Sequence, residues 1–351
     1  MKYEEYLRRN YASLSSFYNE DGSLKREDVL SLLLNEEYGR IKEVPYTLEF
    51  EVKKKELWAC GNIEKSSIIM HIHFDSCSVE IPFLTFVPTG LGLCPAFLYI
   101  SFVSQAPNEL LPVEEICDNG FAIITFCCED VAKDADDDFS GELEKILIGT
   151  REGNTAGKLS LWSTAASMIM DYVMTMDTVD KDNIAIIGHS RLGKVSLLTG
   201  AKDERFKYTI VNESGCSGAA LSLEKKGESI RMINSMFPNW LAINYRKYND
   251  KEAYAKFDQH FMLALVAPRF LYVASAAGDE GADPDGEYIS CVLADEAYKK
   301  LGKKGFIHPA RDINPGEYYM DGDIGYHKRA GQHFLGRYDW QMFMKFIKSK
   351  I

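Results

Sequence analysis

Short apolar runs alternate with longer stretches of helical periodicity through most of the chain beyond residue 88. The apolar runs have the length of strands and lie at residues 96–103, 121–126, 184–187, 208–211 and 270–274. Between and after them, residues 159–174 predict a long buried helix, and residues 251–265, 287–301 and 340–347 predict amphipathic ones. This alternation is typical of a mostly parallel sheet covered by helices on both faces.

The chain before residue 88 has a different pattern. Apolar and polar residues partly alternate at residues 47–52 and 68–74, which predicts antiparallel strands at the start of the main sheet. The first forty residues look helical and polar, with Ser23 as a candidate N-cap for a helix over residues 24–35. No repeat or low-complexity linker divides the chain. We therefore expect a helical extension over residues 1–45 and one α/β domain over residues 46–351.

Composition describes a folded, acidic protein. Hydrophobic residues make up 46% of the 351 positions and charged residues 26%, which is ordinary for a packed globular domain. The chain has 40 Lys and Arg against 52 Asp and Glu, and its net charge of −12 repels phosphate backbones and anionic lipid surfaces. No apolar run approaches the roughly 20 residues of a membrane span. We therefore expect neither nucleic acid nor a membrane as a partner.

Two features bear on the compartment. Residues 1–10 lack the apolar stretch and the small-residue cleavage site of a signal peptide. The eight cysteines include no C-x-x-C pair, which favours reduced and mostly buried thiols. Together these features predict a cytoplasmic protein.

The strongest chemical signal is an apolar strand, a sharp turn and a helix over residues 183–198. A serine at the tip of such a turn exposes its hydroxyl at the carboxyl edge of the sheet, and neighbouring backbone N–H groups point at a substrate carbonyl oxygen. Gly188 stands two positions before Ser190, but the glycine usually found two positions after the serine comes one step late, at Gly193. The pattern predicts an α/β-hydrolase fold with Ser190 as nucleophile, and an ordinary strand-to-helix turn is the alternative.

Two neighbours of Ser190 are candidates for substrate contacts. The N–H of Arg191 would supply the first oxyanion donor, and we expect a second donor near Ser104, in the loop after the strand at residues 96–103. Lys194 lies one helical turn after Ser190, so its ammonium could reach an oxygen-rich substrate beside the scissile bond. A solvated surface lysine is the alternative.

A serine hydroxyl needs a general base within reach and a carboxylate that orients the base. Glu213 and Asp279 each follow an apolar strand, at the sheet edge where active sites of open α/β sheets gather. His333 lies in a loop just ahead of the last predicted helix and is the expected base, whereas His327 is expected to be structural. The residues alone leave the choice between Glu213 and Asp279 open.

The remaining histidines give weaker signals. His71 and His73 share one face of a strand, a spacing that suits zinc, but no third ligand is suggested nearby and ordinary strand histidines are expected. His260 falls on a predicted helix and is expected in the core, although the run Asp258-Gln259-His260 is a weaker candidate for a metal site. We expect no metal and no organic cofactor.

Several motifs, in order along the chain, resemble one known family. They are Gly188-His189-Ser190-Arg191-Leu192-Gly193-Lys194, Asn212-Glu213-Ser214-Gly215-Cys216-Ser217-Gly218, Asp258-Gln259-His260 running into Ala267-Pro268-Arg269, Ala282-Asp283-Pro284, and His327-x-Arg329-x-Gly331-x-His333. From about residue 82 to the C-terminus they look like the bacterial glucuronoyl esterases of carbohydrate esterase family 15 and their acetyl xylan esterase-like relatives. The turn that carries the nucleophilic serine in this family resembles G-x-S-R-x-G-K, which accounts for the late position of Gly193.

The resemblance implies a serine esterase with one role for each candidate residue. It implies Ser190 as nucleophile, His333 as base, Glu213 as the first choice of acid and Asp279 as the second, Arg191 as an oxyanion-hole residue and Lys194 as a substrate contact.

Two departures from the family bear on the substrate. Members that act on glucuronoyl esters usually carry a tryptophan just after the position of Asp279, whereas residues 279–284 of this chain include no aromatic side chain. Many relatives are exported to break down plant cell walls, whereas we expect an intracellular esterase that acts on imported oligosaccharides or another small ester. The expected substrate is a glucuronoyl ester or an acetylated saccharide. The alternatives are a general esterase, a deacetylase or peptidase of the same fold, and a non-catalytic carbohydrate-binding relative.

Overall fold

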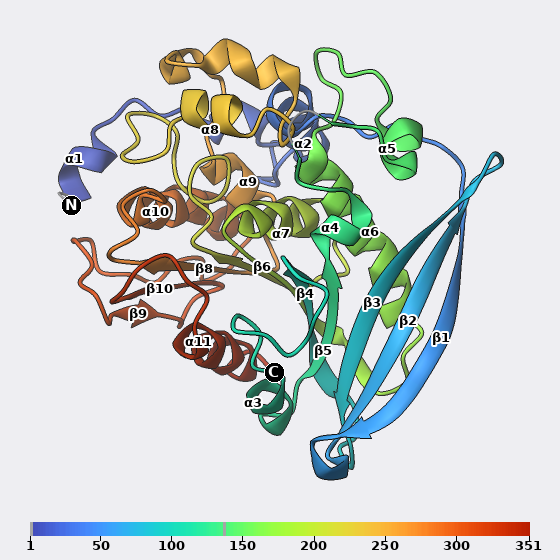
Figure 1. Cartoon of the computed structure of the whole chain (residues 1–351). Helices are drawn as coiled ribbons and strands as arrows, with labels where there is room; N and C mark the ends of the chain where they lie inside the picture. Colours follow the sequence, from blue (N-terminus) through green and yellow to red (C-terminus); the bar gives the residue numbers. More distant parts are fainter. Residues whose placement is uncertain (1–2, 136–137) are drawn as a thin grey trace.

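The computed structural model describes residues 3–135 and 138–351, and these residues form one ten-stranded mixed sheet (Figure 1). In spatial order the strands are β1-β2-β3-β5-β4-β6-β7-β8-β10-β9. Their bounds are Thr47–Trp58 (β1), Ile63–His73 (β2), Ser78–Pro88 (β3), Cys94–Ser101 (β4), Ala122–Cys127 (β5), Val179–His189 (β6), Tyr208–Asn212 (β7), Phe270–Ala276 (β8), Tyr318–Tyr319 (β9) and Ile324–Arg329 (β10). Neighbouring strands from β5 across to β10 are parallel. The pairs β1–β2, β2–β3, β3–β5 and β10–β9 are antiparallel. The predicted fold class is confirmed.

Helices cover both faces of this sheet, as the alternating pattern predicts. Their bounds are Tyr3–Leu7 (α1), Arg26–Leu33 (α2), Val113–Asp118 (α3), Cys128–Val131 (α4), Glu142–Leu147 (α5), Lys158–Val173 (α6), Arg191–Lys202 (α7), Ile230–Met236 (α8), His260–Ala264 (α9), Pro284–Lys300 (α10) and Arg337–Lys348 (α11). In Figure 1, α6, α7 and α10 lie on one side of the sheet, and α3 and α11 lie on the other. Two separate hydrophobic clusters, one on each face, form the core.

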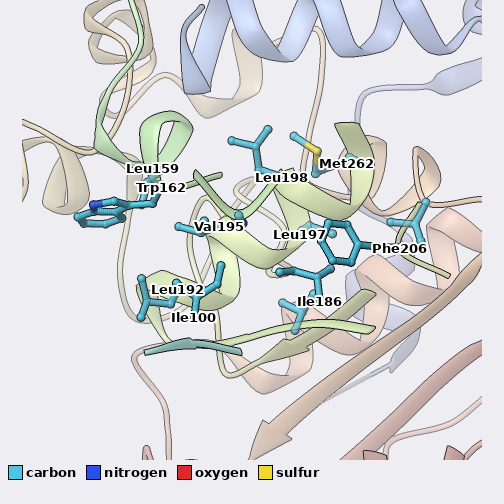
Figure 2. Close-up of a cluster of buried hydrophobic side chains, with 14 of the residues drawn as sticks. Ile100, Leu159, Trp162, Ile186, Leu192, Val195, Leu197, Leu198, Phe206 and Met262 are labelled. Atoms are coloured by element: carbon cyan, nitrogen blue, oxygen red, sulfur yellow. The ribbon is translucent and has the colours of Figure 1, made fainter. Parts of the chain in front are cut away.

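The packing of α7 fixes the position of the predicted nucleophile. Figure 2 shows its side chains between sheet residues and neighbouring helices, with Ile100, Ile186, Leu192, Val195, Leu198, Leu159, Trp162 and Met262 among those drawn. Close packing of this kind leaves little room for a helix to shift. The N-terminus of α7, which begins directly after Ser190, is therefore a rigid support.

Two predicted helices differ from those in the structure. The helix expected over residues 251–265 is wrong, because only a 3₁₀ turn at Glu252–Tyr254 and the short α9 form there. The Asp258 carboxylate accepts the N–H groups of Ser222 (2.6 Å) and Leu223 (3.2 Å), so this segment is tied to a distant loop. Asp side chains that bind backbone in this way compete with helix formation.

The expected cap at Ser23 is wrong too. Helix α2 begins at Arg26 with Lys25 at the N-cap position, and the Ser23 hydroxyl donates to Asp21 Oδ1 instead (2.6 Å). The helix ends in a single π-turn at Leu34–Tyr38. The turn places the buried side chain of Glu37 beside Gln259, whose Nε2 donates to Glu37 Oε1 at 2.9 Å.

Residues 3–45 pack against the rest of the chain. Tyr6, Val29, Leu33 and Tyr38 belong to the same buried cluster as α6 and α7. Tyr6 also donates its hydroxyl to Asp283 Oδ1, which lies 277 positions further along the chain (3.2 Å). Among the residues that the structure describes, no helix is long and apolar enough to cross a membrane.

Candidate active site

Four neighbouring parallel strands carry the predicted catalytic residues to one edge of the sheet. In the order β6-β7-β8-β10, these strands end shortly before Ser190, Glu213, Asp279 and His333. All four strands run in the same direction, so the loops after their carboxyl ends meet above one edge. The topology therefore brings together side chains that are far apart in the sequence.

Ser190 occupies a strained turn between β6 and α7. Its φ of 58° and ψ of −128° lie in a region that non-glycine residues rarely adopt. Its N–H donates to the Asn212 carbonyl at the end of β7 (2.9 Å). This is the geometry of a nucleophile elbow, in which the strain holds the hydroxyl out from the sheet edge.

Contacts around the turn explain why its glycines stand where they do. A Cβ on Gly188 would lie 2.0 Å from the Leu192 carbonyl oxygen, so only glycine fits two positions before the serine. A Cβ on Gly193 would lie 3.0 Å from Ser214 Cβ and 3.1 Å from the Asn212 carbonyl oxygen. The close approach between α7 and β7 therefore falls at residue 193, which is why the second glycine is displaced.

Ser190 opens into a cavity of about 200 Å³ that the predicted site residues share. The lining residues are Ser190, Arg191, Lys194, Glu213, Ser214, Gly215, Glu228, Phe237, Trp240, Asp279, Gly281, Ala282 and His333. All six residues predicted for the site are among them. The cavity brings together the Ser190 hydroxyl, the His333 imidazole, three carboxylates, two cationic side chains and two aromatic rings.

The predicted base pairs most closely with Asp279. His333 Nδ1 lies 2.6 Å from Asp279 Oδ2 and 3.4 Å from Glu213 Oε2. Both carboxylates thus face the same ring nitrogen, which would orient Nε2 away from them. The shorter contact makes Asp279 the direct hydrogen-bond partner.

Glu213 is occupied by other donors. Its side chain is fully buried, its Oε1 accepts from Arg329 Nη2 at 2.6 Å, and its Oε2 accepts the N–H of Phe334 at 3.0 Å. Arg329 in turn pairs with the buried Asp339 (3.1 Å). These contacts reverse the expected ranking, because the geometry favours Asp279 over Glu213 as the partner of His333.

The pair of acids changes the protonation of the base. Burial lowers the pKa of His333, but its hydrogen bonds to Asp279 and Glu213 outweigh that effect and raise the pKa to about 9. Burial also opposes ionisation of Asp279, yet the hydrogen bond from His333 leaves the pKa of this carboxyl below its usual value. For Glu213, burial dominates and raises the pKa.

Arg191 offers two kinds of hydrogen-bond donor to the cavity. It is the first residue of α7, so its backbone N–H has no acceptor within the helix and lies at the positive end of the helix dipole. Its guanidinium lies 4.7 Å above the Phe102 ring, and its Nε lies 3.0 Å from Asp134 Oδ2. Ser104, near which we expected a second donor, lines a different cavity and donates to Asp130 Oδ2 (2.8 Å).

Lys194 reaches the cavity from a buried position. Its ammonium donates to the carbonyl oxygens of Ser214 and Cys216, the second at 2.6 Å. Burial lowers its pKa. The surface-lysine alternative is therefore excluded, and Lys194 both holds the loop after Glu213 and lines the cavity.

Phe237, Trp240 and Glu228 are among the lining residues that were not predicted from the sequence. Phe237 and Trp240 stack in parallel with their ring centroids 3.7 Å apart, and Glu228 adds a carboxylate to the lining of the cavity. Aromatic residues of this kind look like core positions in the sequence, so no local pattern identifies them. Residues 237–240 supply an aromatic surface that the segment after Asp279 lacks.

The other histidines lie outside this cavity. His327 is fully buried on β10 and bonds to Asp339 Oδ1 (2.8 Å) and the Tyr272 hydroxyl (2.9 Å), which is a structural role as expected. His260 is buried in α9, and the oxygens of neighbouring Asp258 already accept backbone N–H groups. This arrangement does not favour the metal site considered for residues 258–260.

The two strand histidines are bridged by carboxylates. His71 Nε2 and Nδ1 lie 3.3 Å from Glu51 and Glu80 respectively, and His73 lies 3.4 Å from Glu49. These contacts link β1, β2 and β3 across the sheet surface.

Among the residues that the structure describes, only Glu213, Asp279 and His333 bring together ligand atoms that could hold a metal ion. Oxygens of Glu213 and Asp279 and a ring nitrogen of His333 lie within 4.8 Å of one another. The Arg329 guanidinium beside Glu213 disfavours a further cation there. The geometry fits an acid-base pair better than a metal centre.

Comparison with known proteins relates this chain to esterases that act on carbohydrates. A family model described as glucuronyl esterase of fungi matches residues 83–302. The carbohydrate esterase MZ0003, from an unknown prokaryotic organism, is 37% identical over 238 residues, which are 67% of this chain and 54% of the relative. A 4-O-methyl-glucuronoyl methylesterase of Phanerochaete chrysosporium is 30% identical over 261 residues, 72% of this chain and 52% of that protein. The chain thus spans about half the length of the curated relatives it matches.

Solved structures match over nearly the full chain. A promiscuous CE15 esterase from a marine bacterial metagenome superposes with a TM-score of 0.88 at 28% identity, covering 99% of both chains. A glucuronoyl esterase from Solibacter usitatus superposes with a TM-score of 0.85 at 30% identity, covering 97% of this chain and 98% of that one.

Proposed function

The chain belongs to the glucuronoyl esterase family, and we propose that it hydrolyses a carbohydrate-derived carboxylic ester through a covalent acyl-enzyme. One observation carries this proposal. The strained Ser190 and the His333–Asp279 pair open into the same cavity, together with the Arg191 donors. A nucleophile, an oriented base and a cationic donor in one cavity are the parts that acyl transfer requires.

The proposed reaction begins when Ser190 Oγ attacks the ester carbonyl and His333 takes the hydroxyl proton. The carbonyl oxygen becomes an oxyanion, which the N–H and guanidinium of Arg191 stabilise. His333 then gives the proton to the departing alcohol oxygen, and the C–O bond of the ester breaks. A water molecule releases the acid from Ser190 by the same steps, with His333 again as base. Asp279 stabilises the imidazolium that forms in each step.

We propose a uronic acid ester as the substrate, because the cavity suits a polar ring that carries a carboxyl derivative. Lys194, Arg191 and Glu228 are charged groups around the nucleophile, and the stacked rings of Phe237 and Trp240 form one wall. Aromatic faces pack against the apolar faces of sugar rings and shape the pocket. On this proposal, residues 237–240 take over the stacking role of the missing tryptophan after Asp279.

A broader esterase is the second candidate. The structural neighbour with a TM-score of 0.88 is described as a promiscuous CE15 esterase, and this likeness favours acetylated saccharides or simple esters as additional substrates. We also propose a cytoplasmic enzyme with no nucleic acid or membrane partner, which the unpaired state of the eight cysteines and the net charge of −12 support. Cell fractionation of the source organism tests the location.

The test compares a methyl glucuronate ester with p-nitrophenyl acetate, using wild type, Ser190→Ala and Ser349→Ala. Ser349 lies at the end of α11, outside the cavity, and its variant controls for serine removal in general. We expect Ser190→Ala to lower kcat by roughly 10⁶-fold. Cleavage of the glucuronate ester that depends on Ser190 supports the uronate proposal, and cleavage of acetate alone favours the broader esterase. Activity that survives Ser190→Ala contradicts the mechanism.

A further inference from the structure

A partly buried carboxylate outside the cavity, that of Asp134, contacts residues that line it. Asp134 follows α4, its side chain is only 10% exposed, and it is not among the residues that line the cavity. Its Oδ1 accepts from Trp240 Nε1 (2.7 Å) and Asn239 Nδ2 (3.0 Å), and its Oδ2 lies 3.0 Å from Arg191 Nε. One carboxylate therefore joins the start of α7 to the aromatic wall.

These contacts restrain the Arg191 guanidinium from two directions. The Asp134 carboxylate forms an ion pair with the Nε edge of the guanidinium, although the two groups are not aligned for a hydrogen bond. The Phe102 ring lies 4.7 Å from the guanidinium carbon. Because a guanidinium is planar, restraining one edge and one face also sets the direction of its two terminal nitrogens. Among the described residues, none accepts a hydrogen bond from those terminal nitrogens. They are left available to a group in the cavity.

We propose that Asp134 is a positioning residue, which holds Arg191 so that its terminal N–H groups meet the oxyanion. The inference rests on the proposed function, since it requires Ser190 to form a tetrahedral intermediate. A donor that is already in place stabilises developing charge without reorganisation during the reaction. The negative charge of Asp134 partly offsets the field of Arg191, so its benefit comes from orientation and not from charge.

The direct test is Asp134→Asn, alone and combined with Arg191→Ala. Asparagine keeps an acceptor for Trp240 but loses the ion pair with Arg191. We expect Asp134→Asn to lower kcat by ~10-fold with little change in KM, and Arg191→Ala to lower kcat by ~10²-fold. The double variant should be no slower than Arg191→Ala, because Asp134 would act only through that side chain. Effects that multiply to ~10³-fold would overturn the proposal.

Asp130→Asn is the matched control. Asp130 lies on the same short segment, but its carboxylate accepts from Ser104 and faces a different cavity. Its substitution should leave kcat and KM unchanged. If Asp134→Asn does not fold, Asp134→Glu replaces it, alone and combined with Arg191→Ala, because it keeps the charge and moves the carboxylate by one methylene. An equal kcat loss in the Asp134 and Asp130 variants would contradict the proposal.

A second readout separates this inference from the proposed substrate. A fluorophosphonate probe reacts with an activated serine, forming an Oγ–P bond and releasing fluoride, and it needs the oxyanion donors but no sugar ester. We expect the labelling rates of wild type, Asp134→Asn, Arg191→Ala and the double variant to follow the pattern expected for kcat, with the double variant no slower than Arg191→Ala. Normal labelling without ester hydrolysis would refute only the substrate. A wild-type chain that does not label would refute both the nucleophile and the role of Asp134.

Discussion

The two acids beside His333 should separate into one that serves catalysis and one that serves stability. Asp279 lies 2.6 Å from His333 Nδ1, whereas Glu213 lies 3.4 Å away and already accepts from Arg329 and the Phe334 N–H. The perturbations are Asp279→Asn and Glu213→Gln. Each removes one negative charge and changes the volume of the side chain very little.

The expected magnitudes follow from burial and contacts. Replacing the orienting Asp of a triad by Asn lowers kcat by about 10⁴-fold. We expect Asp279→Asn to lower kcat by ~10³-fold, because Glu213 still faces the His333 ring at 3.4 Å. Its effect on the free energy of unfolding should be below ~1 kcal/mol, since His333 is 43% exposed.

Glu213→Gln should show the opposite balance. Its fully buried carboxylate pairs with Arg329, which is 12% exposed, and breaking a buried pair costs about 3–5 kcal/mol. We expect the lower value, about 3 kcal/mol, because Arg329 also pairs with Asp339. The loss in kcat should stay within ~10-fold, as the ring keeps its bond to Asp279.

The assay measures kcat for a methyl glucuronate ester on the plateau of each pH profile, together with unfolding in urea. Plateau values are needed because removing either acid changes the pKa of His333. If Glu213→Gln loses as much kcat as Asp279→Asn while its unfolding free energy stays that of wild type, the assignment is refuted. The double variant provides the control, and it should be slower than Asp279→Asn alone.

Three further predictions test other parts of the site. His333 must be neutral to act as base, and its pKa is raised to about 9, so kcat/KM should rise with pH from 7 to 9. Asp279→Asn should move this rise in kcat/KM to lower pH. A rise that stays at the same pH contradicts the pairing of His333 with Asp279. Gly193→Ala places a Cβ 3.0 Å from Ser214 Cβ and should lower the unfolding free energy by ~1–3 kcal/mol in a urea titration, whereas an unchanged midpoint argues against the close approach. Lys194→Met leaves two buried carbonyl oxygens without their donor and should cost ~1–3 kcal/mol in the same assay; a change in KM alone would mean that the lysine serves only substrate.

Local sequence was sufficient to predict much of the fold and the six residues expected to line the candidate site. The apolar runs predicted β4, β5, β6, β7 and β8, because strands buried on both faces must be continuously apolar. The elbow around Ser190 depends on near neighbours in the chain, so glycine spacing and flanking pattern predict it. The acids and His333 follow strands or precede the last helix, and parallel strands bring such positions to one edge.

Tertiary contacts decided what those patterns left open. Asp279 partners His333 because Arg329, on another strand, occupies Glu213. The helix expected over residues 251–265 does not form as one element, because Asp258 binds a loop that is distant in the sequence. The aromatic wall of Phe237 and Trp240, and Asp134, which contacts Arg191, lie in segments that carry no local signal. Sequence periodicity reports which face of an element is buried, whereas the partner of a buried charge depends on which other donors reach it in the folded chain.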